Sequence, residues 1–187
     1  MSEASQQGRK LGIGAVSAVA LFVVLSTGIA GFVEAGLVED GGWKRAAGQV
    51  LAPWIAAAIL CALTVSIHAV VCRAVFIQYL DCVFSRRRLI IAMLVLLLAH
   101  AAEVQIFGLG IYAYSHLMNE TLGGQAEGRL LDYLYFSYVT YTSLGLGDIY
   151  PENSLRLLVG LEALTGLLMI GWSASMTVVV FRREWFS

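Results

Sequence analysis

Four long apolar stretches decide what this chain can fold into. They run from about residue 11 to 33, 50 to 77, 89 to 118 and 155 to 181. A helix needs about 20 apolar residues to cross the hydrocarbon core of a bilayer, so each stretch is long enough to span it. Charged residues make up only 13% of the chain, against about 25% in soluble proteins. The sequence therefore predicts an all-α membrane protein with four transmembrane helices.

The basic residues predict how these helices are oriented. With the N-terminus in the cytoplasm, all but four of the 12 lysines and arginines fall on the cytoplasmic side, where basic residues are enriched in membrane proteins. We therefore expect a multi-pass protein of the cell (inner) membrane with both termini in the cytoplasm. The net charge of −1 gives no reason to expect a nucleic-acid partner. The spacing of Cys61, Cys72 and Cys82 fits no metal motif, so we expect reduced cysteines that serve packing.

The segment between the third and fourth apolar stretches has a different character. Residues 119–129 are polar, and residues 130–141 are apolar and aromatic. As a helix, 130–141 would rise only about 18 Å, which is too short to span a membrane. It must therefore either re-enter the membrane or lie in the interface.

A glycine-containing segment, Thr142-Ser143-Leu144-Gly145-Leu146-Gly147-Asp148, follows this short helix. Alternating glycines allow backbone conformations in which successive carbonyl oxygens point the same way. A row of such oxygens can replace the hydration shell of a cation, as in potassium channels. Non-helical backbone at membrane depth is tolerated only where it is buried in protein or lines a polar path. The pattern therefore indicates an ion pathway.

Residues 132–151, DYLYFSYVTYTSLGLGDIYP, resemble the pore loop of tetrameric potassium channels. With the flanking apolar stretches, the resemblance covers about half of the chain. It is closest to small prokaryotic channels with two transmembrane helices and a pore loop, here preceded by two additional helices. The resemblance implies an N-terminal two-helix region, 1–88, and a pore domain, 89–187. The pore domain would contain an outer helix, a re-entrant pore helix at 130–141, a filter at 142–148 and an inner helix at 155–181.

The resemblance also implies roles for individual residues. The permeant ion would be K⁺, and no organic cofactor is expected. The oxygens of Ser143, Leu144, Gly145 and Leu146 would coordinate K⁺, with Thr142 and Gly147 at the two ends of the filter. Asp148 would support the filter, with Tyr135 as its hydrogen-bond partner. The family's commonest filter has Thr, Val and Tyr where this chain has Ser143, Leu144 and Leu146, and some members have a glutamate at the position of Val139. One chain supplies one loop, so a ring of carbonyls implies a homotetramer.

Glu162 lies at the depth of the short helix, about 10 Å along the fourth apolar stretch. Because ionisable residues inside a membrane are costly, we expect a function for it. One hypothesis is that its carboxyl group accepts hydrogen bonds from hydroxyls of the pore helix, such as those of Tyr138, Thr140 or Tyr141, and braces the filter. The alternative is a protonated carboxyl group that faces another helix.

His100 and Glu103 are three residues apart and share one helix face. They form either a pH sensor or a structural hydrogen-bonded pair. Along their helix they lie about 16 and 21 Å from the cytoplasmic end, whereas His68 lies about 10 Å from that end of its own helix. His68 is therefore barely able to reach His100, and it is even less able to reach Glu103.

Gly166 and Gly171 are candidate bending points for a gate, or positions of close helix packing. The sequence as a whole predicts a potassium-selective channel embedded in lipid. Ser143 and Leu146 differ from the residues commonest in the family's filter, and this leaves open a weakly selective cation channel. A third possibility is a non-conducting sensory or accessory subunit. No nucleophile–base set stands out, so we do not expect an enzyme.

Overall fold

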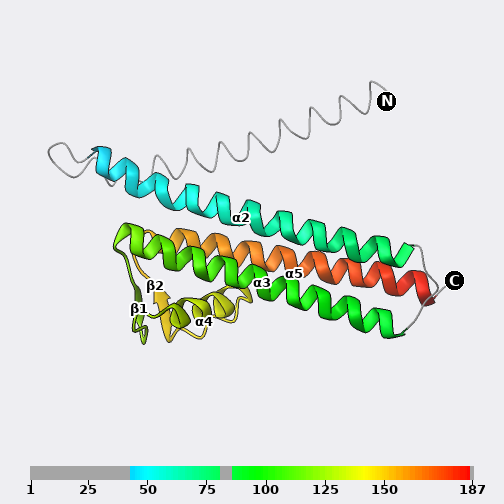
Figure 1. Ribbon diagram of the computed structural model, residues 1–187. Coiled ribbons are helices and arrows are strands. Elements are labelled where there is room, and N and C mark those ends of the chain that lie inside the picture. The colour runs from blue at the N-terminus through cyan, green and yellow to red at the C-terminus, as the bar shows by residue number, and fades with distance from the viewer. Residues whose placement is uncertain (1–42, 81–85, 186–187) are drawn as a thin grey trace, which may run out of the picture. The chain divides into compact units, whose positions relative to one another are not determined.

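The structure is a computed structural model that describes residues 43–80 and 86–185. The predicted span at 11–33 and Cys82 lie outside the described residues. The elements, labelled in Figure 1, are α2 (Trp43–Leu80), α3 (Arg86–Met118), β1 (Leu122–Gly124), α4 (Leu130–Tyr141), β2 (Ile149–Pro151) and α5 (Leu155–Trp185). The chain divides into two compact units, residues 1–54 and 55–187. All contacts discussed below lie within the second unit.

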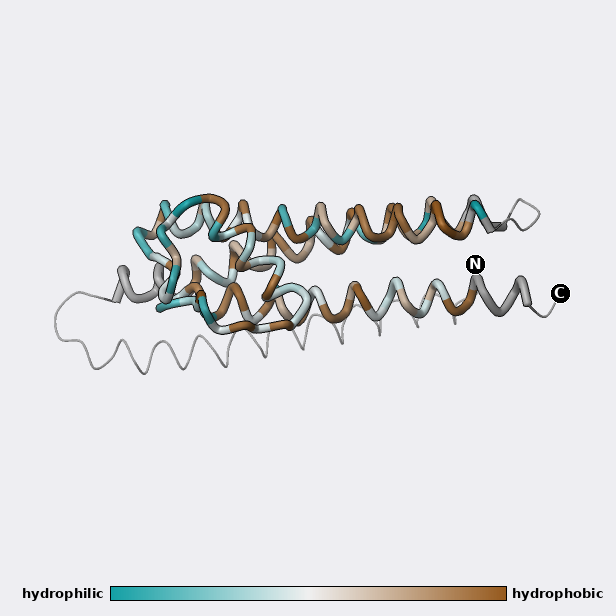
Figure 2. The backbone as a smooth tube through the Cα atoms, turned by 90° about the horizontal axis from the view of Figure 1, so that it is seen from below, coloured by the Kyte–Doolittle hydropathy of each residue, from teal (hydrophilic) through white to brown (hydrophobic). Residues whose placement is uncertain are grey.

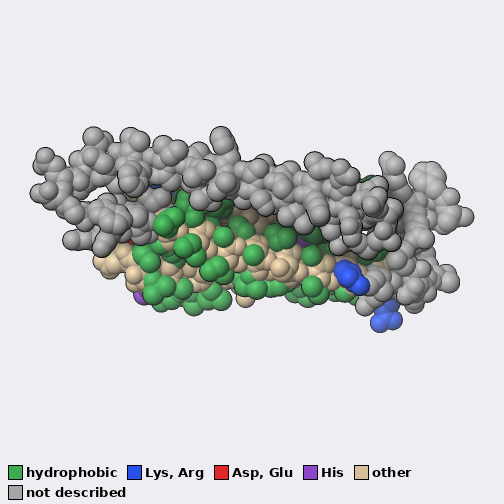
Figure 3. Space-filling model, turned by 90° about the horizontal axis from the view of Figure 1, so that it is seen from above, with side chains coloured by type: hydrophobic (Ala, Val, Ile, Leu, Met, Phe, Trp, Pro, Cys, Tyr) green, Lys and Arg blue, Asp and Glu red, His purple; other side chains and the backbone are tan. Residues whose placement is uncertain are grey.

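Three helices in the described part of the chain are long and apolar enough to cross a membrane. Their apolar segments are Leu51–Phe76 in α2, Leu89–Met118 in α3 and Leu155–Val179 in α5. Only 22% to 39% of the residues in these segments are buried, although the segments are strongly apolar. Figure 2 shows hydrophobic residues along the long helices, while hydrophilic ones gather mainly in the connections at one end. In the view of Figure 3, the described surface is largely hydrophobic. Such apolar outer faces need lipid or further protein to cover them.

The short helix α4 packs against α3 and α5 (Figure 1). Before and after it, β1 and β2 pair in antiparallel fashion with Gly123 opposite Tyr150. Because β1 precedes α4 and β2 follows the loop after it, this pairing returns the chain to the end of α3 from which it left. The core beneath α4 contains Val104 and Phe107 from α3, Tyr141 from α4 and Met169 from α5.

Two glycines allow α4 to lie this close to its neighbours. A Cβ atom at Gly108 of α3 would lie 2.9 Å from Leu134 Cδ2 and 3.2 Å from Leu134 Cα. A Cβ atom at Gly166 of α5 would overlap the carbonyl oxygen of Tyr141 and lie 2.9 Å from its carbonyl carbon. Both contacts involve the α4 backbone, so the small residues set the position of α4 between α3 and α5.

Candidate functional site

The loop after α4 is held to the end of that helix by backbone hydrogen bonds. The N–H of Ser143 donates to the Thr140 carbonyl at 2.8 Å, and that of Leu144 donates to the Val139 carbonyl at 2.9 Å. The N–H of Gly145 reaches the same Val139 carbonyl at 3.3 Å. The last carbonyls of a helix lack partners within the helix, and the loop supplies them here. The loop therefore begins in a fixed position relative to α4.

The φ angle of the loop backbone is positive at every second residue. Ser143, Gly145 and Gly147 have positive φ angles of 57°, 57° and 81°, whereas Leu144 and Leu146 are not among the residues with positive φ. In an extended chain of uniform hand, successive residues point to opposite sides. A reversal at every second residue brings consecutive carbonyl groups towards one side, which is the arrangement a dehydrated cation needs. Glycine takes such angles without a steric penalty.

The same loop is open to its surroundings in a single protomer. Leu144 and Leu146 are 63% and 59% exposed. A Cβ atom built at Gly145 or Gly147 would meet nothing within 4 Å. Contacts with the described residues therefore do not explain the glycines, and the two leucines lie open.

Asp148 follows the loop and is held on two sides. Its carboxylate accepts a hydrogen bond of 2.8 Å from the hydroxyl of Tyr135, as the resemblance implied. Its backbone carbonyl accepts one of 2.9 Å from the N–H of Gln125. The hydrogen bond to Asp148 raises the pKa of the Tyr135 phenol, with smaller contributions from desolvation and from the negative charge. Tyr135 therefore remains a neutral donor near neutral pH.

Glu120 ties the ends of α3 and α5 together, a role that sequence reasoning missed. Its carboxylate accepts hydrogen bonds of 2.7 and 2.9 Å from the Ser154 hydroxyl. It also accepts one of 3.2 Å from the N–H of Leu155, the first residue of α5. The Ser154 hydroxyl also lies 2.7 Å from that of Tyr114. A serine directly before a predicted helix was the available signal, because serine is a preferred helix-capping residue.

Glu162 is fully buried and contacts α4 through Ser137. The partner is a hydroxyl of the helix at 130–141, as the hypothesis held, but the examples it gave, Tyr138, Thr140 and Tyr141, were wrong. Ser137 and Tyr141 are four residues apart and share the buried face of α4, whereas Tyr138 is 42% exposed. Sequence reasoning identified the helix but not the face that it turns towards α5.

The hydrogen bonds of Ser137 bear on the protonation of Glu162. The Ser137 hydroxyl lies 2.8 Å from the Val104 carbonyl oxygen and also contacts Glu162 Oε1. A hydroxyl has one proton to donate and the carbonyl has none. If that proton points at the Val104 carbonyl alone, the contact with Glu162 is a hydrogen bond when Glu162 carries a proton and donates it to Ser137. Among the described residues, Glu162 Oε2 has no hydrogen-bond partner.

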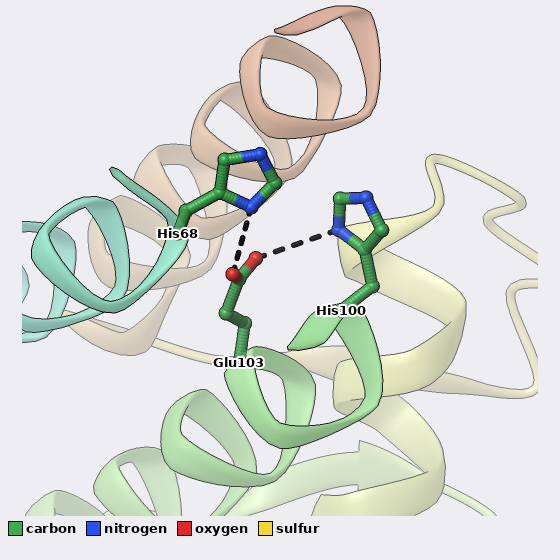
Figure 4. Close-up of side chains that lie close together, drawn as sticks. All are labelled: His68, His100 and Glu103. Carbon is green, nitrogen blue, oxygen red and sulfur yellow. Dashed lines mark hydrogen bonds and ion pairs between the residues drawn. The ribbon is translucent and has the colours of Figure 1, made fainter. Parts of the chain in front are cut away.

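A second polar cluster contains His68 of α2 with His100 and Glu103 of α3, which are drawn in Figure 4, and also Tyr141 of α4 and Ser173 of α5. His68 Nδ1 lies 2.9 Å from Glu103 Oε1, and His100 Nδ1 lies 3.4 Å from Glu103 Oε2. The Tyr141 hydroxyl donates to Glu103 Oε2 and lies 3.1 Å from His100 Nδ1. The Ser173 hydroxyl lies 3.0 Å from His100 Nε2 and 3.2 Å from His68 Nε2. These five side chains form a closed ring of contacts next to Thr142, the first residue of the loop.

The structure brings His68 and Glu103 into contact, although the sequence suggested that this pair is harder to bring together than His68 and His100. Helix α2 continues to Leu80, so His68 lies about 18 Å from its end. The distance of about 10 Å expected from the sequence was too small, because residue 77, where the apolar stretch ends, already lies about 14 Å from His68. Glu103 lies about 26 Å from the start of α3 at Arg86. The remaining difference arises because neighbouring helices need not end at the same level. Depth counted from estimated helix ends was therefore a poor guide to this pairing.

The two glycines proposed as bending points differ in their surroundings. Gly166 lies against the backbone of Tyr141, whereas a Cβ atom at Gly171 would meet nothing within 4 Å. Close packing thus explains Gly166 directly, and bending at either position remains a prediction.

Comparison with known proteins gives the same picture as this geometry. Residues 92–183 match the family model described as "Ion channel". A segment of 44 residues is 43% identical to the two pore potassium channel a of Oryza sativa subsp. japonica, and it covers 24% of this chain and 12% of that protein. No solved structure matches the chain. The prediction from the sequence is confirmed at the level of the family: this chain carries, at residues 92–183, an ion-channel domain of the potassium-channel pore-domain family.

Proposed function

We propose that the chain is one subunit of a homotetrameric, potassium-selective channel whose filter is the segment Thr142–Asp148. The observation that carries this proposal is the exposed loop after α4, in which the φ angle is positive at every second residue. This loop lies between helices long enough to span a membrane. In the proposed pore, backbone oxygens of Ser143, Leu144, Gly145 and Leu146 replace the water around K⁺. The Ser143 hydroxyl serves the innermost site.

The exposure of the loop supports an oligomer. Unpaired backbone groups cost several kcal/mol in hydrocarbon, so a lone protomer could not leave this loop facing lipid. Four copies around one axis would cover Leu144 and Leu146 and bring the carbonyls into a ring. In this arrangement α4 is a re-entrant pore helix whose negative C-terminal end favours a cation at mid-membrane.

The proposed topology has four transmembrane helices with both termini in the cytoplasm. Three of them correspond to α2, α3 and α5, and the fourth is the stretch at 11–33. The connection from Asn119 to Arg129 would then face the outside of the cell membrane. The distribution of lysine and arginine supports this orientation.

Replacement of Gly145 by alanine tests the filter. A left-handed residue with a Cβ atom costs about 1–2 kcal/mol, and the ring contains four such positions. We expect potassium flux from protein reconstituted in liposomes to fall at least about tenfold, since 1.4 kcal/mol corresponds to a factor of ten. Gly128→Ala is the matched control, because Gly128 also has a positive φ, of 78°, and open space but lies outside the loop. Equal flux through both variants would remove the filter from Thr142–Asp148.

The second candidate function is a weakly selective cation channel. Leu146 lacks the tyrosine hydroxyl that can tie the family's filter to the pore helix, and its side chain is 59% exposed in a protomer. Reversal potentials in mixed sodium and potassium separate the two functions. A reversal potential close to the potassium equilibrium potential supports selectivity, and a reversal potential near zero supports the weakly selective channel. Absence of any flux from well-folded protein would leave the accessory-subunit hypothesis.

Removal of the Ser137 hydroxyl tests whether Glu162 braces the filter. In Ser137→Ala, the Val104 carbonyl and the Glu162 carboxyl group both lose a buried partner, which costs about 1–3 kcal/mol. We expect a lower unfolding temperature of the solubilised protein and a flux that decays faster under sustained conduction. The control is Ser175→Ala, because Ser175 is exposed and its hydroxyl donates to the Gly171 carbonyl of its own helix. A variant with lower stability but unchanged flux decay would mean that the contact supports the fold alone.

A further inference from the structure

The ring formed by His68, Glu103, Tyr141, His100 and Ser173 is not needed for a carbonyl filter. It lies behind the filter, between the pore helix and α2, and His68 and Glu103 are fully buried. Its members come from four helices. His68 belongs to α2, Tyr141 to α4 and Ser173 to α5, and the other two belong to α3. A buried polar cluster of this kind is costly unless it is fully paired.

The ring is one proton short. Five contacts run around it, which join Glu103 to His68, His68 to Ser173, Ser173 to His100, His100 to Tyr141, and Tyr141 to Glu103. A longer sixth contact, of 3.4 Å between His100 and Glu103, crosses the ring. Two neutral imidazoles, one serine and one tyrosine supply four protons, and an ionised carboxylate supplies none. One contact is therefore left without a hydrogen, and the ring carries one negative charge. A bound cation would take the place of the missing hydrogen and offset the negative charge, and a divalent ion would leave the ring with a net charge of +1.

The donors that converge are a metal-binding set. One ligand atom each from His68, His100 and Glu103 lies within 4.8 Å of the others. Figure 4 shows both imidazoles directed at the same carboxylate, and in each case Nδ1 is the nearest nitrogen. Two imidazoles and one carboxylate hold zinc in many proteins and leave a further coordination position open. Imidazole nitrogen also favours cobalt, nickel, copper and iron over magnesium or calcium.

The surrounding groups are placed to orient these ligands. With an ion on the two Nδ1 atoms, both Nε2 atoms carry protons and face the Ser173 hydroxyl at 3.0 and 3.2 Å. The serine oxygen has two lone pairs and can accept both hydrogen bonds. The Tyr141 hydroxyl donates to the second carboxylate oxygen. Metal-bound histidines and carboxylates usually have such outer partners, which fix their orientation.

From these contacts we infer that His68, His100 and Glu103 form a binding site for a divalent transition-metal ion of the zinc type. The ion links α2 to α3 and is connected through Glu103 to Tyr141, the residue that precedes the filter. The His100 side chain is 18% exposed and gives access to the site. Binding does not depend on the proposed conduction of K⁺, so either conclusion can fail without the other.

Binding of Zn²⁺ and Co²⁺ to the purified full-length protein, free of any affinity tag, tests the site. We expect one ion per protomer by equilibrium titration, visible absorption bands from bound Co²⁺ without a thiolate band, and displacement of Co²⁺ by Zn²⁺. Zn²⁺ should also raise the unfolding temperature. His68→Gln and His100→Gln should each weaken binding at least about tenfold, because each removes one of three ligands.

The chain offers a matched control. His116, the third histidine, contacts the Tyr112 carbonyl of its own helix and lies outside the ring. His116→Gln should therefore bind the metal like the unchanged protein. Loss of binding in His116→Gln but not in His68→Gln would overturn the site. So would the absence of stoichiometric binding by folded protein, in which case a proton completes the ring. Retained binding without potassium flux would contradict only the proposed channel function.

Discussion

Replacing Gly166 by alanine is expected to destabilise the packing of α4 on α5. The new Cβ atom would overlap the carbonyl oxygen of Tyr141 and lie 2.8 Å from its Cγ. Backbone atoms at the end of a helix cannot move aside as a flexible side chain does, and overpacking of this kind costs about 1–3 kcal/mol. Four subunits contribute this cost to the tetramer proposed above. We expect a clear drop in the unfolding temperature of solubilised protein, and potassium flux reduced to a small fraction of that of the unchanged chain.

Gly171→Ala is the matched control for this prediction. It makes the same substitution one and a half turns further along α5, where nothing lies within 4 Å of the new atom. Its unfolding temperature should be unchanged or slightly higher, because alanine favours a helix over glycine by about 1 kcal/mol. Two variants of equal stability would contradict the packing role of Gly166. Full stability of Gly166→Ala combined with lost channel opening would instead favour the hinge.

Replacing Glu103 by alanine is expected to have an effect of similar size. The substitution leaves His68, His100 and the Tyr141 hydroxyl without their shared acceptor inside the protein. A buried group left unpaired costs about 1–3 kcal/mol, and removal of one member of a buried ionic cluster costs about 3–5 kcal/mol. We expect much of the protein to fail to assemble, and the remainder to unfold at a markedly lower temperature.

Two further variants separate this effect from a general loss of a carboxylate. Glu103→Gln keeps an acceptor oxygen for one of the three partners, so its loss of stability should be smaller than that of Glu103→Ala. Glu127→Ala removes an exposed carboxylate that pairs with Arg129 at 3.0 Å, where both side chains are more than 60% exposed. Surface pairs of this kind contribute little, so stability should hardly change. A Glu103→Ala protein as stable as Glu127→Ala would show that the ring is not structurally important.

The sequence determined the features that depend on a pattern along the chain. Apolar stretches of spanning length specify membrane helices, because a bilayer requires about 20 apolar residues in a row whatever their neighbours are. The glycine-containing loop after a helix too short to span indicated the candidate filter, because carbonyl alignment is a property of the local backbone. The resemblance to potassium-channel pore loops also named Tyr135 as the partner of Asp148, and both residues belong to the one segment that carries the resemblance.

Only the tertiary structure decided which residues meet across helices. Ser137, rather than Tyr138, Thr140 or Tyr141, reaches Glu162, because the rotation of α4 about its axis depends on its packing against α3 and α5. His68 reaches Glu103 because the axial offset of α2 from α3 is set by side-chain packing and not by where either helix begins. Gly166 lies under Tyr141 for the same reason. Helix rotation and offset leave no periodic trace in one sequence, so the apolar pattern indicates the helices but not the polar contacts between them.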